Sequence, residues 1–415
     1  MRKVKSILCV LMMLTMVLSF TACGKDEKKE EASGGADVAD VENIEDAVTV
    51  AGDYTKGKYS FVFDAEIEVE DIVVSGAISL DGKVNNGNAS AGVGLKFDAQ
   101  SLDSSIDEKL SIDEDLGDAF VIVDDMMYID LDSCVDTMTG VETELGFFAV
   151  PMPEYDEDVQ KELQDETMEL MQGLIEAMFA DVDVEKDGST FSIKIKDAET
   201  VIAIAKGAVE YVSENKDKIN EYYNSNMNSN TFDVQAYLES VLDYYRDDIK
   251  AAGEVMGQEI TDDMIDSLLD EIEYEDMETG EIDVFGDVDF DSVLEEIENA
   301  DVESLQAEMD DMGLVVEFSI TAEADKYEFD CTVSFGDEEG TGCFGISYIF
   351  EVEDVSISAP DKVASITDIV EFISENPEEI QNLYNGLMGV LEDWGLYDYL
   401  IGGNMGASNE AVMGY

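Results

Sequence analysis

Apolar and polar residues alternate from Tyr59 to Val69, with aromatic and aliphatic side chains at one parity and acidic side chains at the other. A strict period of two predicts a β-strand with one buried face. Asp81-Gly82 and the Asn-Asn-Gly-Asn run at 85–88 supply turn residues after it. Further strands are expected over 72–80, 93–97, 120–123, 127–131 and 147–150. Residues 51–156 therefore predict the N-terminal part of an antiparallel sheet.

The spacing of apolar residues changes to a helical one after Pro151 and Pro153. Residues 157–312 predict a mainly helical insertion, interrupted at 182–196 by a hairpin that turns on Asp187-Gly188. Alternation then returns in three segments, and residues 313–360 predict the C-terminal part of the sheet. C-terminal helices are expected over 361–402, with a loose tail over 403–415. Whether the two β segments form one sheet is left open by the pattern.

The first residues resemble a secretory signal. Three basic residues precede an apolar run of 14 residues, Ile7–Phe20, and a membrane-spanning helix needs about 20. The run closes on Thr21-Ala22-Cys23-Gly24, which resembles the lipobox of bacterial lipoproteins, although Phe20 stands where leucine is commoner. We expect residues 1–22 to be a removed signal peptide and Cys23 to be lipidated, with ordinary secretion or an uncleaved anchor as alternatives. Residues 23–50 then predict an acidic, flexible tether at the outer face of the cell membrane.

The net charge limits the classes of partner that the chain is expected to bind. The chain has 100 acidic and 22 basic residues and a formal net charge of −78, and losing the three basic residues of the signal peptide would leave −81. So negative a chain is not expected to bind nucleic acid or other polyanions. Ca²⁺ or an envelope protein remains a candidate partner. The alternative explanation is that dense surface carboxylates only keep a secreted protein soluble.

The residue types argue against common catalytic designs. The chain has no histidine, which excludes Ser-His-Asp and Cys-His catalysis and histidine-bound zinc. We expect no enzyme activity and no cofactor. Cys331 shares the parity of the apolar residues of its segment, whereas Cys343 is offset in parity from the apolar residues of its own segment. This register disfavours a disulfide, unless a bulge shifts it, and favours free thiols.

Acidic residues at 183, 185 and 187 before Gly188 partly match a calcium-binding loop, but Lys194 occupies the twelfth position, where glutamate is needed. The pairs at 124–125, 262–263 and 310–311 are expected to be solvated surface. No metal site is predicted.

Aromatic residues at strand positions give two interpretations. They either line an apolar-ligand site or pack as ordinary core against the helices, and periodicity alone does not separate the two. The candidates are Phe61, Phe63, Phe97, Phe329, Phe335, Tyr348 and Phe350.

The lipobox, the acidic tether, the long meander and the Val-Ser-Ile-Ser-Ala-Pro segment ending at Pro360 resemble Gram-positive bacterial lipoproteins of the lipoprotein-carrier (LolA/LppX-like) group. The resemblance implies a curved, half-barrel-like antiparallel meander with helices on one face. With the predicted elements, the expected fold is α+β, with this meander, a large helical insertion and a C-terminal helix packing on one face. It also implies an apolar or lipid ligand on the concave face. The helical insertion is the departure from that group, because it is long enough to fill the face.

Two functions are therefore kept open. The first is a membrane-anchored, extracytoplasmic lipoprotein that binds or carries an apolar or lipid ligand. The alternative is an acidic structural or interaction lipoprotein of the cell envelope, with a protein partner or Ca²⁺ and no small-molecule ligand. Whether the helices cover the apolar sheet face discriminates between them.

Overall fold

The computed structural model describes residues 38, 41–69, 72–85, 87–101, 109–115, 117, 119–139, 143–152, 157–228, 234–271, 283–286, 288–336 and 340–377. The chain forms two compact units, each made of several chain segments. Unit 1 contains Met1–Met127, Pro151–Ser240 and Ile272–Ala359, and unit 2 contains Tyr128–Val150, Val241–Glu271 and Pro360–Tyr415. The expected signal peptide, Cys23, the end of the expected C-terminal helical region and the expected tail lie outside the described residues.

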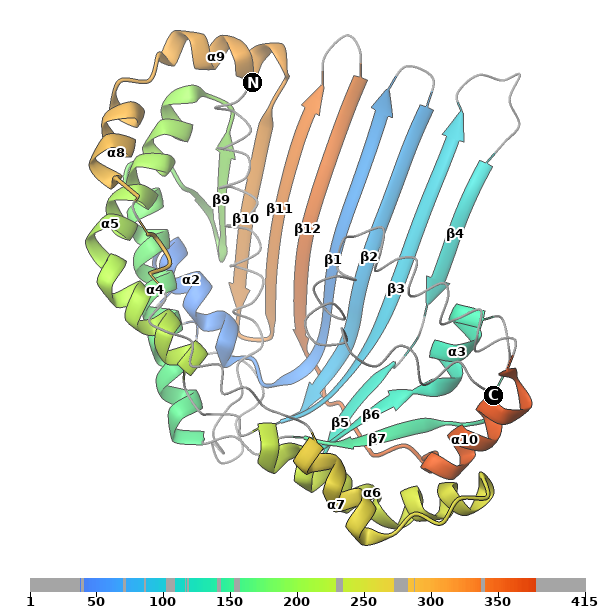
Figure 1. Cartoon of the computed structure of the whole chain (residues 1–415). Helices are drawn as coiled ribbons and strands as arrows, with labels where there is room; N and C mark the ends of the chain where they lie inside the picture. The colour runs from blue at the N-terminus through green and yellow to red at the C-terminus, as the bar shows by residue number, and fades with distance from the viewer. Residues whose placement is uncertain are drawn as a thin grey trace. The chain divides into compact units, whose positions relative to one another are not determined.

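Unit 1 is built on one large antiparallel sheet (Figure 1). The strand order is β5-β3-β2-β1-β12-β11-β10-β9-β8, and β4 pairs with the same edge of β3 as β5 does. The sheet is open and does not close on itself. Its strands are β1 (Lys56–Val69), β2 (Ile72–Asn85), β3 (Asn88–Ser101), β4 (Lys109–Asp115), β5 (Phe120–Val123), β8 (Glu185–Asp187), β9 (Thr190–Ile195), β10 (Val315–Glu323), β11 (Lys326–Gly336) and β12 (Gly340–Val352).

The two β segments of the sequence meet in the middle of this sheet. β1 pairs with β2 on one side and with β12 on the other, and the β1–β12 register aligns Tyr59 with Phe350 and Phe63 with Ile346. The pairing of β1 with β12 answers the question that the hydrophobic pattern leaves open. An α+β fold with a large open antiparallel sheet, as expected, is what the structure shows.

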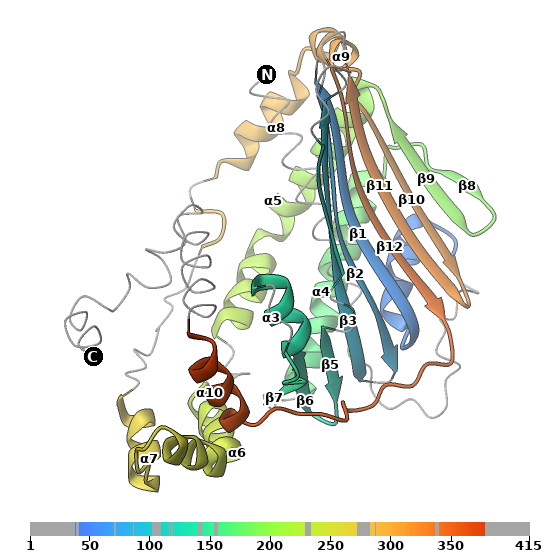
Figure 2. The same ribbon diagram turned by 90° about the vertical axis from the view of Figure 1, so that its right-hand side faces the viewer.

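The helices of unit 1 are α2 (Ile44–Thr49), α4 (Glu157–Phe179), α5 (Ala198–Asn228), α8 (Phe290–Glu298) and α9 (Val302–Asp311), and a short 3₁₀ helix η1 (Val50–Asp53) follows α2. The main core joins α2, α4, α5 and α9 to one face of β9, β10 and β11. Figure 2 views the sheet nearly edge-on, with α5 lying to one side of it. Buried apolar side chains of α4 and α5, such as Ile175 and Ile204, explain their helical spacing in the sequence.

The expected tether extends too far toward the C-terminus. Its last residues form α2, whose Ile44, Ala47 and Val48 are buried in the core. Asn43 caps this helix by accepting a hydrogen bond from the backbone of Asp46 at 2.8 Å. A six-residue helix is too short to show a period in the sequence, and tertiary burial stabilises it instead.

Unit 2 contains the paired strands β6 (Met126–Asp130) and β7 (Phe147–Pro151), most of whose residues belong to it. Its helices are α3 (Leu131–Thr139), most of α6 (Val234–Val255), α7 (Asp262–Glu271) and α10 (Ile366–Glu375). Tyr245 of α6 stacks on Phe148 of β7 with ring centroids 5.2 Å apart, and its hydroxyl donates to the backbone oxygen of Ala149. Within the described residues, no helix has both the length and the apolar character needed to cross a membrane.

Leu131 was expected to end a strand and instead begins α3. The side chain of Asp130 accepts hydrogen bonds from the backbone N–H groups of Asp132 at 3.0 Å and Ser133 at 3.2 Å. A carboxylate in this position caps the start of a helix and turns the chain out of the sheet.

Candidate functional site

One face of β1, β2, β3 and β12 carries no charged side chain. Residues directly opposite each other in an antiparallel pair point to the same side, so the registers define this face. We call it the apolar face. Its residues with described side chains are Gly57, Tyr59, Phe61, Phe63, Ala65 and Ile67 of β1, Ile72, Val74, Gly76, Ile78, Leu80, Gly82 and Val84 of β2, Ala89, Ala91, Val93, Leu95, Phe97 and Ala99 of β3, and Gly340, Gly342, Phe344, Ile346, Tyr348, Phe350 and Val352 of β12.

A single row of side chains runs from this face into the core of unit 1. In strand order it consists of Leu95, Ile78, Phe63, Ile346, Cys331, Phe318 and Ile193. The exposed fraction changes sharply along the row. It is 3–7% for the last three side chains and 39–50% for the first three. The row is therefore equally apolar throughout, but only its β9–β11 half is buried.

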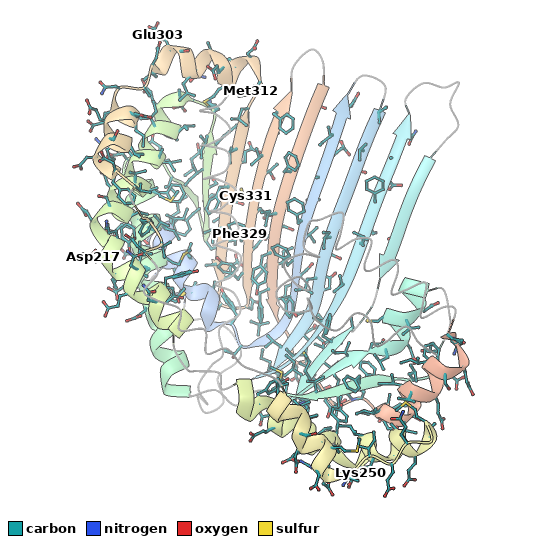
Figure 3. The ribbon with its side chains drawn as sticks, viewed as in Figure 1. Asp217, Lys250, Glu303, Met312, Phe329 and Cys331 are labelled. Atoms are coloured by element: carbon teal, nitrogen blue, oxygen red, sulfur yellow. The ribbon has the colours of Figure 1, made fainter. Side chains whose placement is uncertain are left out.

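The helices account for this difference. Met171, Ile175 and Met178 of α4 belong to the same buried cluster as Phe318 and Cys331. Phe179 at the end of α4 lies with its ring centroid 5.9 Å from that of Phe318 on β10. Figure 3 labels Phe329 and Cys331 on β11, in the part of the sheet where side chains from the helices and the strands crowd together. Ile78 and Leu95 are exposed two and three strands away from β12.

The structure divides the seven aromatic candidates between these two halves, although the registers place all seven on one side of the sheet. Phe329 and Phe350 are core residues, and Phe335 and Tyr348 pack partly buried against that core. Phe61 and Phe97 are half-buried, and Phe63 is exposed. Phe329 and Phe350 therefore serve as core, and the three on β1 and β3 lie outside that core.

Aliphatic residues complete the exposed part of the face. Ile67, Ile72, Ile78 and Leu95 are all exposed, and none of them is aromatic. The same alternation in the sequence contains all four, so the signal was present. Restricting the candidates to aromatic side chains left them out.

Side chains in one row of the apolar face differ strongly in size. Phe97 and Phe344 lie at its ends, and Gly76 and Ala65 lie between them. A methyl group added to Gly76 would meet only the backbone oxygen of Lys96 at 3.5 Å and the ring of Phe97 at 3.8 Å. These are ordinary van der Waals distances, so there is room above the glycine.

The opposite face of the same strands is polar and acidic. On β1 it presents Asp64, Glu66 and Glu68, all exposed. Cys343 of β12 lies on this face opposite Glu66, while Cys331 of β11 lies on the other face opposite Ile346. Both cysteines are free thiols. Burial raises the pKa of the Cys331 thiol to about 11, which keeps it protonated and unreactive at neutral pH.

A pocket of about 470 Å³ lies at the ends of β11 and β12. Its lining includes Glu66, Ser334 and Cys343 from the polar face and Phe335 from the apolar side. It takes residues from both faces and the strand ends. Its lining includes Gly342, so it borders one end of the apolar face.

The acidic motifs of the sequence lie on separate surface elements. Asp187-Gly188 turns the β8–β9 hairpin, with Gly188 at a φ of +66°, and Asp124-Asp125 turns from β5 to β6 with φ values of 51° and 63°. Asp262 and Asp263 begin α7, and Asp310 and Asp311 end α9. Among the residues that the structure describes, no cluster of three or more acidic, cysteine or histidine side chains is arranged to hold a metal ion.

No protein-family model matches this sequence, and no curated protein matches it either.

Proposed function

We propose that this protein is a membrane-anchored, extracytoplasmic lipoprotein, lipidated at Cys23, that binds an apolar or lipid ligand on the apolar face. The observation that carries the proposal is the partial cover of a uniformly apolar sheet face, buried by helices over β9–β11 and exposed over β1–β3. Large exposed apolar patches on otherwise polar proteins mark binding surfaces. On a chain with 100 acidic residues, an uncharged strip across four strands is a strong departure from the rest of the surface.

The dimensions of the face suit an acyl chain. At about 3.4 Å per residue, the stretch from Tyr59 to Ile67 is about 27 Å long, and four strands at about 4.8 Å spacing span about 14 Å. Burying a chain of about 12 carbons at about 0.8 kcal/mol per CH₂ gains up to about 9 kcal/mol before the costs of association. This gain is comparable with the free energy of micromolar binding, about 8 kcal/mol, so the acyl chain would be the main source of affinity.

The anchor and the ligand surface are compatible in this proposal. A diacylated Cys23 would hold the protein at the membrane surface, where amphiphiles are available. Residues 24–42 would then connect the lipid to the first residues of the core. The proposed function involves binding and no catalysis.

The test is a calorimetric titration of the chain from Gly24 onward with 1-lauroyl-lysophosphatidylcholine. Ile78→Asp places a charge on the exposed apolar face, and Ser79→Asp places the same charge one residue away on the polar face. We expect wild type and Ser79→Asp to bind with dissociation constants within about twofold of each other, and Ile78→Asp to bind at least about tenfold more weakly. Circular dichroism establishes that both variants are folded.

Absence of binding by the folded wild type would reject the proposal. Equal loss in both variants would place the ligand elsewhere. The first result would favour the alternative, an interaction lipoprotein that presents its acidic surface to an envelope protein or to Ca²⁺.

A further inference from the structure

The strands that form the apolar face are almost free of positive charge. Residues 59–82 and 327–361 contain no lysine or arginine. The lysines of β1 and β3 are each paired with a carboxylate. The paired distances are 2.6 Å for Lys56–Asp354, 2.5 Å for Lys58–Glu353 and 3.6 Å for Lys96–Asp113.

Carboxylates stand directly behind the exposed part of the face. Asp64, Glu66 and Glu68 alternate along β1 with Phe63, Ala65 and Ile67, so only the thickness of one sheet separates them from a bound ligand. This separation is on the order of the Debye length of about 8 Å at physiological salt. A negatively charged head group beside the apolar face would therefore feel incompletely screened repulsion from several carboxylates at once.

We infer that the ligand of the apolar face is an amphiphile whose head group carries no net negative charge. The inference rests on the proposed function and adds the head-group class to it. Apolar contact supplies the affinity, and the acidic strands behind the face reject anionic amphiphiles with the same chain. Specificity arises here from an unfavourable interaction with the wrong ligand.

The test compares two lysolipids with identical lauroyl chains, lysophosphatidylcholine and lysophosphatidylglycerol, which differ by one unit of net charge. At about 20 mM salt we expect the zwitterionic lipid to bind at least about fivefold more tightly, and the ratio to fall toward about 1 at about 500 mM salt. The protein is the chain from Gly24 onward, and both titrations use calorimetry below the aggregation concentration of the lipids.

A double variant, Glu66→Gln with Glu68→Gln, removes two charges behind the face and leaves the apolar side chains intact. It is expected to tighten lysophosphatidylglycerol binding about twofold and to leave lysophosphatidylcholine binding unchanged. The matched control is Glu295→Gln with Glu296→Gln on α8, which packs on α5 away from β1. This control should alter the ratio by less than the β1 double variant does.

Equal binding of the two lipids at low salt, or tighter binding of the anionic one, would overturn the head-group inference and leave the proposed function standing. Binding of neither lipid would overturn both. An equal effect of the two double variants would also reject the inference, because the discrimination would then come from the net charge of the molecule and not from β1.

Discussion

At the scale of single residues, Cys331 marks the last covered position of the long apolar row. Its thiol is buried beneath the helices. Its neighbour on β12, Ile346, is half-buried, and the next residue of the row, Phe63 on β1, is exposed. Burial disfavours the thiolate and raises the pKa of Cys331 from its ordinary value of 9.0 to about 11. The folded state therefore holds this proton more tightly than the unfolded state does.

This difference predicts a pH dependence of stability. A pKa that is higher in the folded state stabilises the protein fully below about pH 9, and the contribution is lost as the pH rises through about 11. The free-energy difference between wild type and Cys331→Ala, measured by urea unfolding, should fall by up to about 2–3 kcal/mol over that range. A difference that stays constant with pH would show that the thiol titrates normally in the folded protein.

Two glycines on β2 give a second test at this scale. A methyl group on Gly82 would lie 2.1 Å from the backbone oxygen of Ser90 and 2.6 Å from the ring of Tyr59, whereas Gly76 has room. Gly82→Ala is expected to lower the free energy of unfolding by about 2–4 kcal/mol, and Gly76→Ala to change it by less than about 0.5 kcal/mol. Equal effects of the two substitutions on urea unfolding would contradict the close approach of β3 and Tyr59 to Gly82.

At the scale of elements, the sequence predicts where strands occur better than it predicts which strands pair and where the helices dock on them. Period-two alternation identified most of β1, β2, β10, β11 and β12, because each has one apolar side. The β1–β12 pairing joins segments almost 300 residues apart, and no local pattern carries it. The shared side of the aromatic candidates follows from alternation and register. Their division into core and exposed residues depends on where α4 and α5 dock.

The short helix α2 is a second feature that local sequence patterns do not predict. Its residues follow a charged and small-residue stretch, so composition assigned them to the tether. In the structure Tyr54, just beyond η1, donates its hydroxyl to the backbone oxygen of Glu323 at 2.5 Å and fixes this segment to β10. Tertiary contact therefore decides where the folded part of the chain begins.

Ile44→Ala tests the role of α2. Ile44 is 2% exposed, so the truncation should lower the free energy of unfolding by about 2–4 kcal/mol. Glu42→Ala, an exposed neighbour on the N-terminal side of the same helix, should change it by less than about 0.5 kcal/mol. If Ile44→Ala unfolds in urea like wild type, residues 44–50 belong to the tether after all.

At the scale of the whole molecule, charge opposes folding while the apolar core drives it. A formal net charge of −78 makes the folded chain repel itself, and salt screens that repulsion. Raising KCl from about 10 to about 200 mM should raise the melting temperature by about 3–10 °C. Sorbitol at equal osmolality is the control for solvent effects. A melting temperature that does not change with KCl would mean that the carboxylates are already neutralised by bound ions or by local pairing.

The central claim is that the apolar face of β1–β3 and β12 holds an acyl chain. The most direct measurement is native mass spectrometry with lipid extraction on the chain from Gly24 onward, purified from a bacterial host without detergent. The account predicts a co-purifying lipid near one equivalent in wild type and in Ser79→Asp, and its loss in Ile78→Asp. Lipid-free wild-type protein that also takes up no added lysolipid would contradict the account.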